Sequence, residues 1–496
     1  MNCYISKEIP FADAYVIPVQ ASRDRLIDLP SRSLCEAADH VVRRLSQDAG
    51  LKEISFLSEG KEIMVVGVYL SGEPLRPRDV YLSMARALRK CKGSGAKDVA
   101  VLLDNCPPLA ADPVLFETTA RLAELVNYEN RGQKSSSSQH SGFQNVALVT
   151  AAEGLDTVLE QALCCARGTT AARDLCNQRA SSQTPETLAE EAGRLCRACG
   201  CEVEILTASE AAALNMDAFL AVARGARNTP PVVIILRWLH GGDTPTVGLI
   251  GKGVVYDSGG YSLKSNQNMR NMFDDMGGGA AVIGAMSAIA GSRLPVNVVG
   301  VIAACENKVS YDAYLPGDII SSMAGKTIEV TNTDAEGRLT LADALTLAIR
   351  REKCDMLVDI ATLTGAAKNA VGRFASAVFS NDDGFFHLLN KAAGIASEKV
   401  WRLDLDPEMR PCLNSPVADL RNGSINPSDG GGAMLAALFL QEFTEGKSWI
   451  HIDMAGVNFR LEPPAFSAAG ATGYGAALLY CLARELPDFW GRGTEK

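Results

Sequence analysis

Three short segments of this 496-residue chain place acidic side chains beside glycines. They are GKGVVYDSGGYSLK at 251–264, DDMGGG at 274–279 and TNTDAEGRL at 331–339. The acids lie in or directly after strand-like sequence, at Asp257, Asp275, Asp334 and Glu336. Carboxylates gathered in this way repel one another unless a cation stands between them. Oxygen ligands collected from several strand ends predict a dinuclear site for Zn²⁺ or Mn²⁺.

The third segment also has a simpler interpretation. Asp334, Glu336 and Arg338 are spaced by two residues, so in an extended segment their side chains would project to one side. Arg338 alone is able to neutralise such a pair of acids, which makes a surface ion pair the alternative for this segment. The further acids Asp257 and Asp275 favour the metal site.

Other catalytic motifs are excluded by their spacing. Lys252 lacks the GxxxxGK[ST] context of a phosphate-binding loop, and Ser258 lacks the glycine two residues before it that a nucleophile elbow requires. The five histidines are far apart and no HExxH motif occurs. His451 lies in a strand-like segment, where a satisfied core residue is a simpler interpretation than a metal ligand.

The composition is that of a globular protein, with 47% hydrophobic and 21% charged residues. A formal net charge of −10 disfavours nonspecific binding to nucleic acid. The 14 scattered cysteines do not form the pattern of a disulfide framework and indicate a reduced protein. The N-terminal sequence lacks the features of a signal peptide, and no run approaches the ~20 apolar residues of a membrane span. We therefore expect a cytoplasmic protein without a membrane segment.

Strand-like and helix-like segments alternate along the chain in two blocks. In the first block, the strand-like runs Ile63–Leu70 and Val99–Leu103 enclose a helical pattern at Asp79–Lys92. A serine-rich stretch within 132–142 suggests a surface loop near a domain boundary. The predicted organisation is an N-terminal α/β domain over 1–150, a connecting helix and linker over 151–183, and a catalytic domain over 184–496.

The second block predicts a mostly parallel central sheet covered by helices. Its apolar strand candidates are Val232–Leu236, Val247–Val255, Val298–Ala304, Met356–Ile360 and Ile450–Asp453. Helical patterns lie between several of them, at Ala280–Ala290, Leu341–Arg350 and Ala433–Phe443. Continuous apolar strands separated by helices are typical of parallel sheets buried on both faces. Ligands of such sheets bind beyond the carboxyl ends of the strands.

The three acidic segments together resemble the leucyl aminopeptidase family, the M17 metallopeptidases. NTDAEGRL is the signature of that family, and GKGVVYDSGG, SLK and DMGG match in order and spacing. Further matches are ARDLCN at 172–177, PGD at 316–318, ATLTG at 361–365 and AGATG at 469–473. The sequences YDSGGYSLK and WIHIDMAGV resemble most the peptidase B branch of the family. The resemblance covers about residues 170–490 and implies a small N-terminal α/β domain with a larger α/β catalytic domain.

The resemblance also implies which residues bind metal. One ion would be held by Lys252, Asp257, Asp275 and Glu336, and the other by Asp257, Asp334 and Glu336, with Zn²⁺, Mn²⁺ or Co²⁺ as the metals. A lysine amine is an unusual ligand because its unperturbed pKa is ~10.4, although a nearby dication lowers that pKa. Lys252 and Asp257 are five residues apart, so the strand must bend or bulge between them, and Gly251 and Gly253 would help.

The family mechanism implies roles for two further residues. A metal-bridging water is the nucleophile, and Lys264 would stabilise the developing oxyanion. Arg338 matches the arginine that holds a bicarbonate ion, which serves as the general base. The free amine of the peptide substrate would coordinate one metal, which explains cleavage from the N-terminus. The family assembles as hexamers, so a homo-hexamer is expected.

The family's pocket for the N-terminal side chain matches small or apolar positions here: Met272, Thr362, Leu363, Gly365 and Ala455. Such a pocket predicts that Leu or Met is preferred. Asn458 is the open point, because its amide would broaden the preference if it faces the pocket. Two alternatives are a catalytically inactive family member that acts as a binding or regulatory protein, and a dinuclear phosphatase, which the absence of clustered histidines disfavours.

Overall fold

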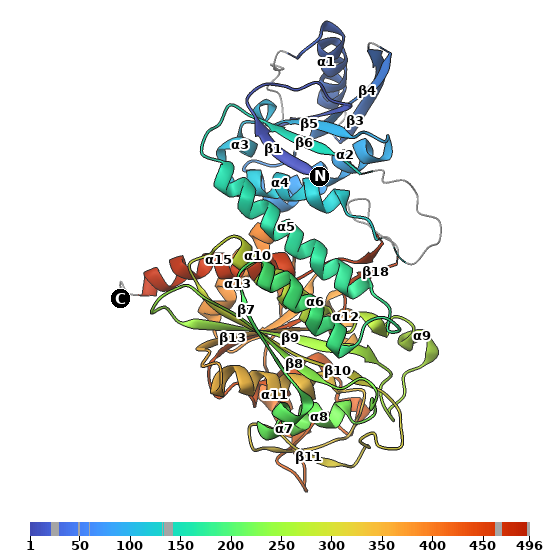
Figure 1. Ribbon diagram of the computed structural model, residues 1–496, viewed down its shortest axis with the longest axis vertical. Helices are drawn as coiled ribbons and strands as arrows, with labels where there is room; N and C mark the ends of the chain where they lie inside the picture. Colours follow the sequence, from blue (N-terminus) through green and yellow to red (C-terminus); the bar gives the residue numbers. More distant parts are fainter. Residues whose placement is uncertain are drawn as a thin grey trace. The chain divides into compact units, whose positions relative to one another are not determined.

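The computed structural model describes residues 1–20, 29–47, 50–58, 60–130, 132, 142–461 and 469–493. The chain divides into two compact units (Figure 1). Unit 1 comprises Met1–Arg167, Gly394–Ser397 and Leu461–Ala469, and unit 2 comprises Gly168–Ala393, Glu398–Arg460 and Gly470–Lys496. The division falls within α5 (Asp156–Asn177). The predicted domain bounds stay a prediction, and the serine-rich residues 133–141 lie outside the described residues.

Unit 1 is built on a six-stranded sheet of order β1-β6-β5-β2-β4-β3. All its neighbouring strands are parallel except the edge pair β3–β4. The strands are β1 (Asn2–Ser6), β2 (Ala14–Val19), β3 (Leu51–Ser58), β4 (Lys61–Tyr69), β5 (Asp98–Leu102) and β6 (Asn145–Val149). The main helices are α1 (Arg32–Gln47), α2 (Pro77–Gly93), α3 (Pro108–Ala111) and α4 (Pro113–Asn127).

Alternate side chains of the unit 1 strands enter two separate cores. In β2, Tyr15 and Ile17 pack with α1, whereas Ala14 and Val16 pack with α2 and α4. Both faces of the sheet are therefore covered, which explains why these strands are continuous apolar runs.

Unit 2 contains an eight-stranded sheet of order β15-β14-β17-β13-β9-β10-β8-β7. The four central strands β17, β13, β9 and β10 are parallel, which confirms the predicted α/β fold class. The pairs β14–β17, β10–β8 and β8–β7 are antiparallel, a direction that apolar runs do not specify. The strands are β7 (Glu202–Leu206), β8 (Val232–Leu239), β9 (Thr246–Asp257), β10 (Asn297–Asn307), β13 (Met356–Ala361), β14 (Ser376–Ser380), β15 (Val400–Arg402) and β17 (Ser448–Asp453).

Helices cover both faces of this sheet (Figure 1). One face carries α6 (Pro185–Ala198), α10 (Gly277–Gly291) and α15 (Ala476–Gly493). The other carries α7 (Ala208–Ala213), α8 (Asp217–Ala223), α11 (Gly337–Arg350) and α14 (Gly432–Gln441). A further long helix is α13 (Asp383–Ala396). Shorter elements are α9 (Asn266–Met269), β11 (Ile319–Ser321), β12 (Thr327–Glu329), α12 (Gly365–Val371), β16 (Leu420–Arg421), β18 (Phe459–Arg460) and β19 (Gly470–Ala471).

Local sequence explains the ends of α6. Thr184 and Thr187 form a reciprocal capping box, and Pro185 occupies the first turn. Gly200, just beyond the helix, has a φ of +94°, which glycine adopts without steric cost.

Glycines bring α10 unusually close to the sheet. A Cβ at Gly278 would lie 2.0 Å from the carbonyl oxygen of Ile360, and one at Gly251 would lie 2.6 Å from Gly279 Cα. Only glycine permits this approach. As a result, the turn that precedes α10 lies directly beside β9, and this turn carries Asp275.

Candidate metal centre

The acidic side chains converge at the carboxyl end of β9. The register between β9 and β10 pairs Cys305 with Val254 but Glu306 with Tyr256, so Val255 is an extra residue. This bulge lies between Lys252 and Asp257, as predicted, and changes the alternation of side chains between them. Gly251 and Gly253 also have a packing role, because a Cβ at either position would collide with atoms of neighbouring elements.

The prediction that residues 334–338 are extended is wrong. Residues 331–336 form a turn, in which the side chain of Asn332 accepts a hydrogen bond from the backbone N–H of Asp334 at 2.8 Å. Glu336 immediately precedes α11 and has helical backbone angles. The turn, and not strand alternation, directs Asp334 and Glu336 to the same place. One oxygen each of Asp257, Asp334 and Glu336 lies within 4.8 Å of the others.

Lys252 joins Asp275 to this group. Its Nζ lies 2.8 Å from Asp275 Oδ2 and 2.8 Å from Glu336 Oε1, and it donates to the carbonyl oxygen of Thr362 at 3.3 Å. Burial opposes the charged form of Lys252, but the carboxylates of Asp275, Glu336 and Asp257 outweigh it. They hold the lysine pKa well above its ordinary value.

Lys264 lies on the other side of the acids. Its Nζ is 2.6 Å from Asp257 Oδ2 and also contacts Asp334 Oδ1. Burial opposes the charge of Lys264 as well, and the surrounding carboxylates, Asp257 first, raise its pKa. Burial also raises the pKa values of the carboxyls of Asp275, Asp334 and Glu336.

This donor set suits divalent metal ions. Four carboxylates face only two ammonium groups, so the site has an excess of negative charge. Glu336 Oε2 is buried and has no hydrogen-bond partner within the described part of the chain. Buried acids in this state need a cation to compensate their repulsion. The residues present therefore fit a divalent metal ion, and the individual ligand assignments stay a prediction.

Arg338 is buried in the first turn of α11. Its Nη1 donates to the carbonyl oxygen of Asn422 at 2.7 Å, whereas its Nε has no partner among the described residues. Burial lowers the pKa of Arg338 to about 10, against the attraction of Glu336 and Asp453. The group remains cationic at neutral pH and retains one unused donor, as an anion-binding arginine would.

The structure connects several of the predicted substrate residues through Asp453. Asp453 ends β17, is buried, and accepts from the backbone N–H groups of Leu363 and Ala455 at 3.3 and 3.2 Å. Thr362 Oγ1 donates to Asp275 Oδ1 at 2.8 Å. The loop after β13 is thus tied to both β17 and Asp275, one of the candidate metal ligands.

The remaining pocket candidates differ in their environment. Met272 is partly exposed, and Gly365 is exposed with open space around its Cα. Asn458 is buried. Its Nδ2 donates to the carbonyl oxygen of Asp274 at 2.8 Å, and its Oδ1 accepts from Cys176 Sγ at 3.9 Å. Both ends of the Asn458 amide therefore have partners inside the protein.

Three supporting residues were missed from sequence: Asn307, Asn422 and Asp453. Asn307 and Asp453 are the last residues of β10 and β17, and both side chains contact the candidate site. A polar residue that closes an apolar strand is the signal that would have found them. Asn422 follows the short strand β16, which gave no signal.

His451 is a core residue, as predicted, and one nitrogen of its ring is paired within the protein. It is fully buried, and its Nδ1 lies 2.6 Å from Asp359 Oδ1, while Trp449 Nε1 donates to the other oxygen of that acid at 2.7 Å. His451 belongs to the sheet core and not to the candidate metal ligands.

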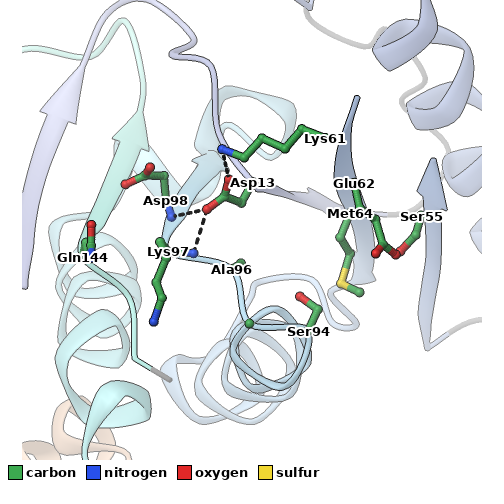
Figure 2. Close-up of a pocket in the computed structure, with 11 residues that line it drawn as sticks. Asp13, Ser55, Lys61, Glu62, Met64, Ser94, Ala96, Lys97, Asp98 and Gln144 are labelled. Atoms are coloured by element: carbon green, nitrogen blue, oxygen red, sulfur yellow. Dashed lines mark hydrogen bonds and ion pairs between the residues drawn. The ribbon is translucent and has the colours of Figure 1, made fainter. Parts of the chain in front are cut away.

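A separate pocket of about 470 Å³ lies in unit 1. Its lining includes Asp13, Lys61, Lys97 and Asp98, at the amino ends of β2, β4 and β5 (Figure 2). Asp13 forms an ion pair with Lys61 and accepts from the backbone N–H groups of Lys97 and Asp98 at 2.8 and 3.0 Å. The carboxylate of Asp13 is thus compensated within this unit, unlike the excess acid of the metal site.

No helix in the described ranges has the length and apolar character needed to cross a membrane.

The family model described as the catalytic domain of the cytosol aminopeptidase family matches residues 170–480. The chain is 38% identical over 447 residues to a probable cytosol aminopeptidase of Clostridium perfringens, covering 88% of this chain and 87% of that protein. A probable cytosol aminopeptidase of Alkaliphilus oremlandii is 37% identical, with 86% and 85% covered.

Solved structures agree with these relatives. A mutant of tomato leucine aminopeptidase superposes with a TM-score of 0.85 at 30% identity, covering 98% of this chain and 96% of that chain. The bottromycin maturation enzyme BotP in complex with Mn superposes with a TM-score of 0.82 at 30% identity, covering 96% and 100%. On the strength of the matched catalytic domain and these relatives, the chain belongs to the cytosol aminopeptidase family, the M17 metallopeptidases, and is an aminopeptidase.

Proposed function

We propose that the chain removes the N-terminal residue from peptides at a dinuclear metal centre. The observation that carries this proposal is the convergence of Lys252, Asp257, Asp275, Asp334 and Glu336 in one acidic site. Lys252, Asp257, Asp275 and Glu336 would hold one ion, and Asp257, Asp334 and Glu336 would hold the other. Zn²⁺, Mn²⁺ and Co²⁺ are the candidate metals, and the Mn complex of BotP supports Mn²⁺.

The reaction is hydrolysis of the first peptide bond. Two bound divalent ions would supply an activated water nucleophile and polarise the scissile carbonyl. Lys264 presents its ammonium group from the Asp257 side of the site and stabilises the negative charge that develops on the carbonyl oxygen. Fixed positive charge in a largely buried site is effective because little reorganisation is needed during the reaction.

Arg338 holds the general base. We assign a bicarbonate ion to this residue because the guanidinium group is buried, remains charged and has its Nε unpaired among the described residues. Arginine suits a planar anion of this kind because its N–H groups form a rigid fork. A bicarbonate ion held there would supply the base for the proton that the attacking water loses.

The pocket for the N-terminal side chain comprises Met272, Thr362, Leu363, Gly365 and Ala455. None of these carries a formal charge, so the pocket accepts Leu and Met. The amide of Asn458 is engaged with Asp274 and Cys176, which supports the sharper apolar preference. A homo-hexamer and a cytoplasmic location complete the proposal; the names of the cytosol aminopeptidase relatives support the location.

A panel of aminoacyl anilides tests this proposal. We expect kcat/KM for Leu and Met to exceed that for Asp and Glu by about 10²-fold or more. A charged side chain loses hydration without gaining an ion partner, which costs several kcal/mol, and ~1.4 kcal/mol is tenfold. The control is Leu anilide with an acetylated amine, which should not be cleaved. Preference for Asp or Glu would contradict the pocket, and no hydrolysis of any substrate would favour the inactive, regulatory alternative.

Metal affinity is expected to rise with pH. Metal-ligating groups must lose their protons, and in the absence of metal the neighbouring acids keep Lys252 protonated at neutral pH. Binding therefore releases at least one proton, and each released proton raises the apparent affinity about tenfold per pH unit. Competition titrations of Mn²⁺ against a chelator between about pH 6 and about pH 8 measure this slope. An affinity that does not change over this range would exclude Lys252 as a ligand.

A further inference from the structure

The side chain of Asn307 connects two of the acid-bearing segments. Asn307 closes β10 and is fully buried. Its Nδ2 donates to Asp257 Oδ1 at 2.8 Å and to the carbonyl oxygen of Thr333 at 2.9 Å. One amide group thus links a metal-binding acid of β9 to the turn that carries Asp334.

The β9 bulge is what places Asn307 opposite Asp257. Beyond the bulge these two residues are register partners, and the Asn307 carbonyl oxygen accepts from both the N–H and the hydroxyl of Ser258, at 2.9 and 2.8 Å. The backbone of Asn307 therefore fixes the residue after Asp257, while its side chain fixes the carboxylate itself.

These contacts decide which oxygen of Asp257 faces the site. Oδ1 accepts from Asn307 and also from the N–H of Gly259 at 2.8 Å, so both donors act on the same atom. Oδ2 points toward Lys264. An amide is suited to this position because it supplies two donors without adding a charge to a site that already contains two lysines.

Tyr314 provides a natural comparison. Its hydroxyl donates to the same Thr333 carbonyl oxygen at 2.9 Å, and it is also buried. The hydroxyl of Tyr314 therefore holds the Asp334 turn in place through Thr333 alone, whereas Asn307 contacts both Thr333 and Asp257. The two residues separate anchoring of the turn from orientation of the acid.

We propose that Asn307 is a positioning residue of the dinuclear centre, which orients the Asp257 carboxylate and sets its separation from the Asp334 turn. The proposal rests on the metal assignment made above. Partners that orient metal ligands from outside the coordination sphere typically contribute about 10–100-fold to metal affinity. Asn307 acts through Asp257 and not on the substrate.

The test is to remove the metals from the full-length chain and to measure its affinity for Mn²⁺ by titration calorimetry. Asn307→Ala and the bulkier, donor-free Asn307→Leu should weaken binding by about 10–100-fold, with the larger loss at the ion held by Asp257, Asp334 and Glu336. Tyr314→Phe should remain close to wild type. Excess Mn²⁺ should restore kcat in the Asn307 variants, because the substrate and catalytic residues are unchanged.

Three results would overturn the inference. The first is a wild-type Mn²⁺ affinity in both Asn307 variants, and the second is an equal loss of Mn²⁺ affinity in Tyr314→Phe. The third is loss of the melting transition of the metal-free protein in both Asn307 variants, which would show that the residue serves stability alone. Failure of the wild-type chain to bind Mn²⁺, Zn²⁺ or Co²⁺ would instead contradict the proposed function. Failure of the Asn307 proposal and failure of the proposed function are therefore distinguishable.

Discussion

Glu336→Ala should remove both metals and with them the activity. Both proposed ligand sets share Glu336 and Asp257. The Oε2 atom of Glu336 is buried and has no hydrogen-bond partner in the described part of the chain. Loss of a residue that hydrogen-bonds to a metal ligand weakens metal binding by about 10–100-fold. Loss of the ligand itself should weaken metal binding by more. We expect kcat/KM to fall by more than about 10³-fold, since the loss of a single oxyanion donor already costs about 10²–10³-fold.

Asp334→Asn should have a more selective effect. Asp334 belongs to only one ligand set, so this variant should retain the ion held by Lys252, Asp257, Asp275 and Glu336. Metal analysis should then find about one ion per chain, against two in the wild type. Activity should still be lost, because the attacking water requires both ions.

Glu306→Gln is the matched control. Glu306 is a buried acid near the same end of the sheet, but Lys308 and Thr229 are its partners. Its replacement should leave metal content unchanged. A Glu336→Ala enzyme that keeps both metals and full activity would refute the metal assignment, and equal metal loss in Glu306→Gln would show that any buried acid here matters.

Lys264→Ala should keep its metals and lose turnover. Lys264 contacts Asp257 and Asp334 through its ammonium group, so its removal takes away a positive charge that competes with the metals. Metal affinity should therefore be equal to wild type or higher. We expect kcat to fall by about 10²-fold or more, as for a lost oxyanion donor. Lys308→Ala is the control, since this lysine pairs with Glu306 outside the site.

Arg338→Ala should produce a similar loss of kcat with a distinct signature. If Arg338 holds bicarbonate, wild-type activity should increase with added bicarbonate and the variant should not respond. The metals should again remain bound, because Arg338 donates to the Asn422 carbonyl oxygen and not to a metal-binding acid. Unchanged kcat in both the Lys264 and Arg338 variants would refute their assigned roles.

Much of the site was accessible from residue types and order alone. Carboxylates beside glycines at the ends of apolar strands identify both the kind of ligand and the edge of the sheet where it binds. The five-residue separation of Lys252 and Asp257 required a bulge, and the structure contains one at Val255. Local sequence also specifies the start of α6 at Thr184 and Pro185, because capping depends on neighbours in the sequence.

Other features depended on contacts between distant segments. The interpretation of Asp334, Glu336 and Arg338 as an extended row was wrong because a spacing of two does not itself specify a strand, and the Asn332 side chain stabilises a turn. Likewise, an apolar run such as Val232–Leu239 indicates burial but not direction, so the antiparallel pairing of β8 was not predicted.

The sequence by itself determined the chemistry of this protein: which acids, which lysines and which arginine are available, and the α/β fold that brings strand ends together. The tertiary structure alone decided how those groups are held. The contacts of Asn307 and Asp453 exist only because β10 and β17 end beside Asp257 and the loop after β13. Register between strands arises from packing over the whole sheet, so no local pattern records it.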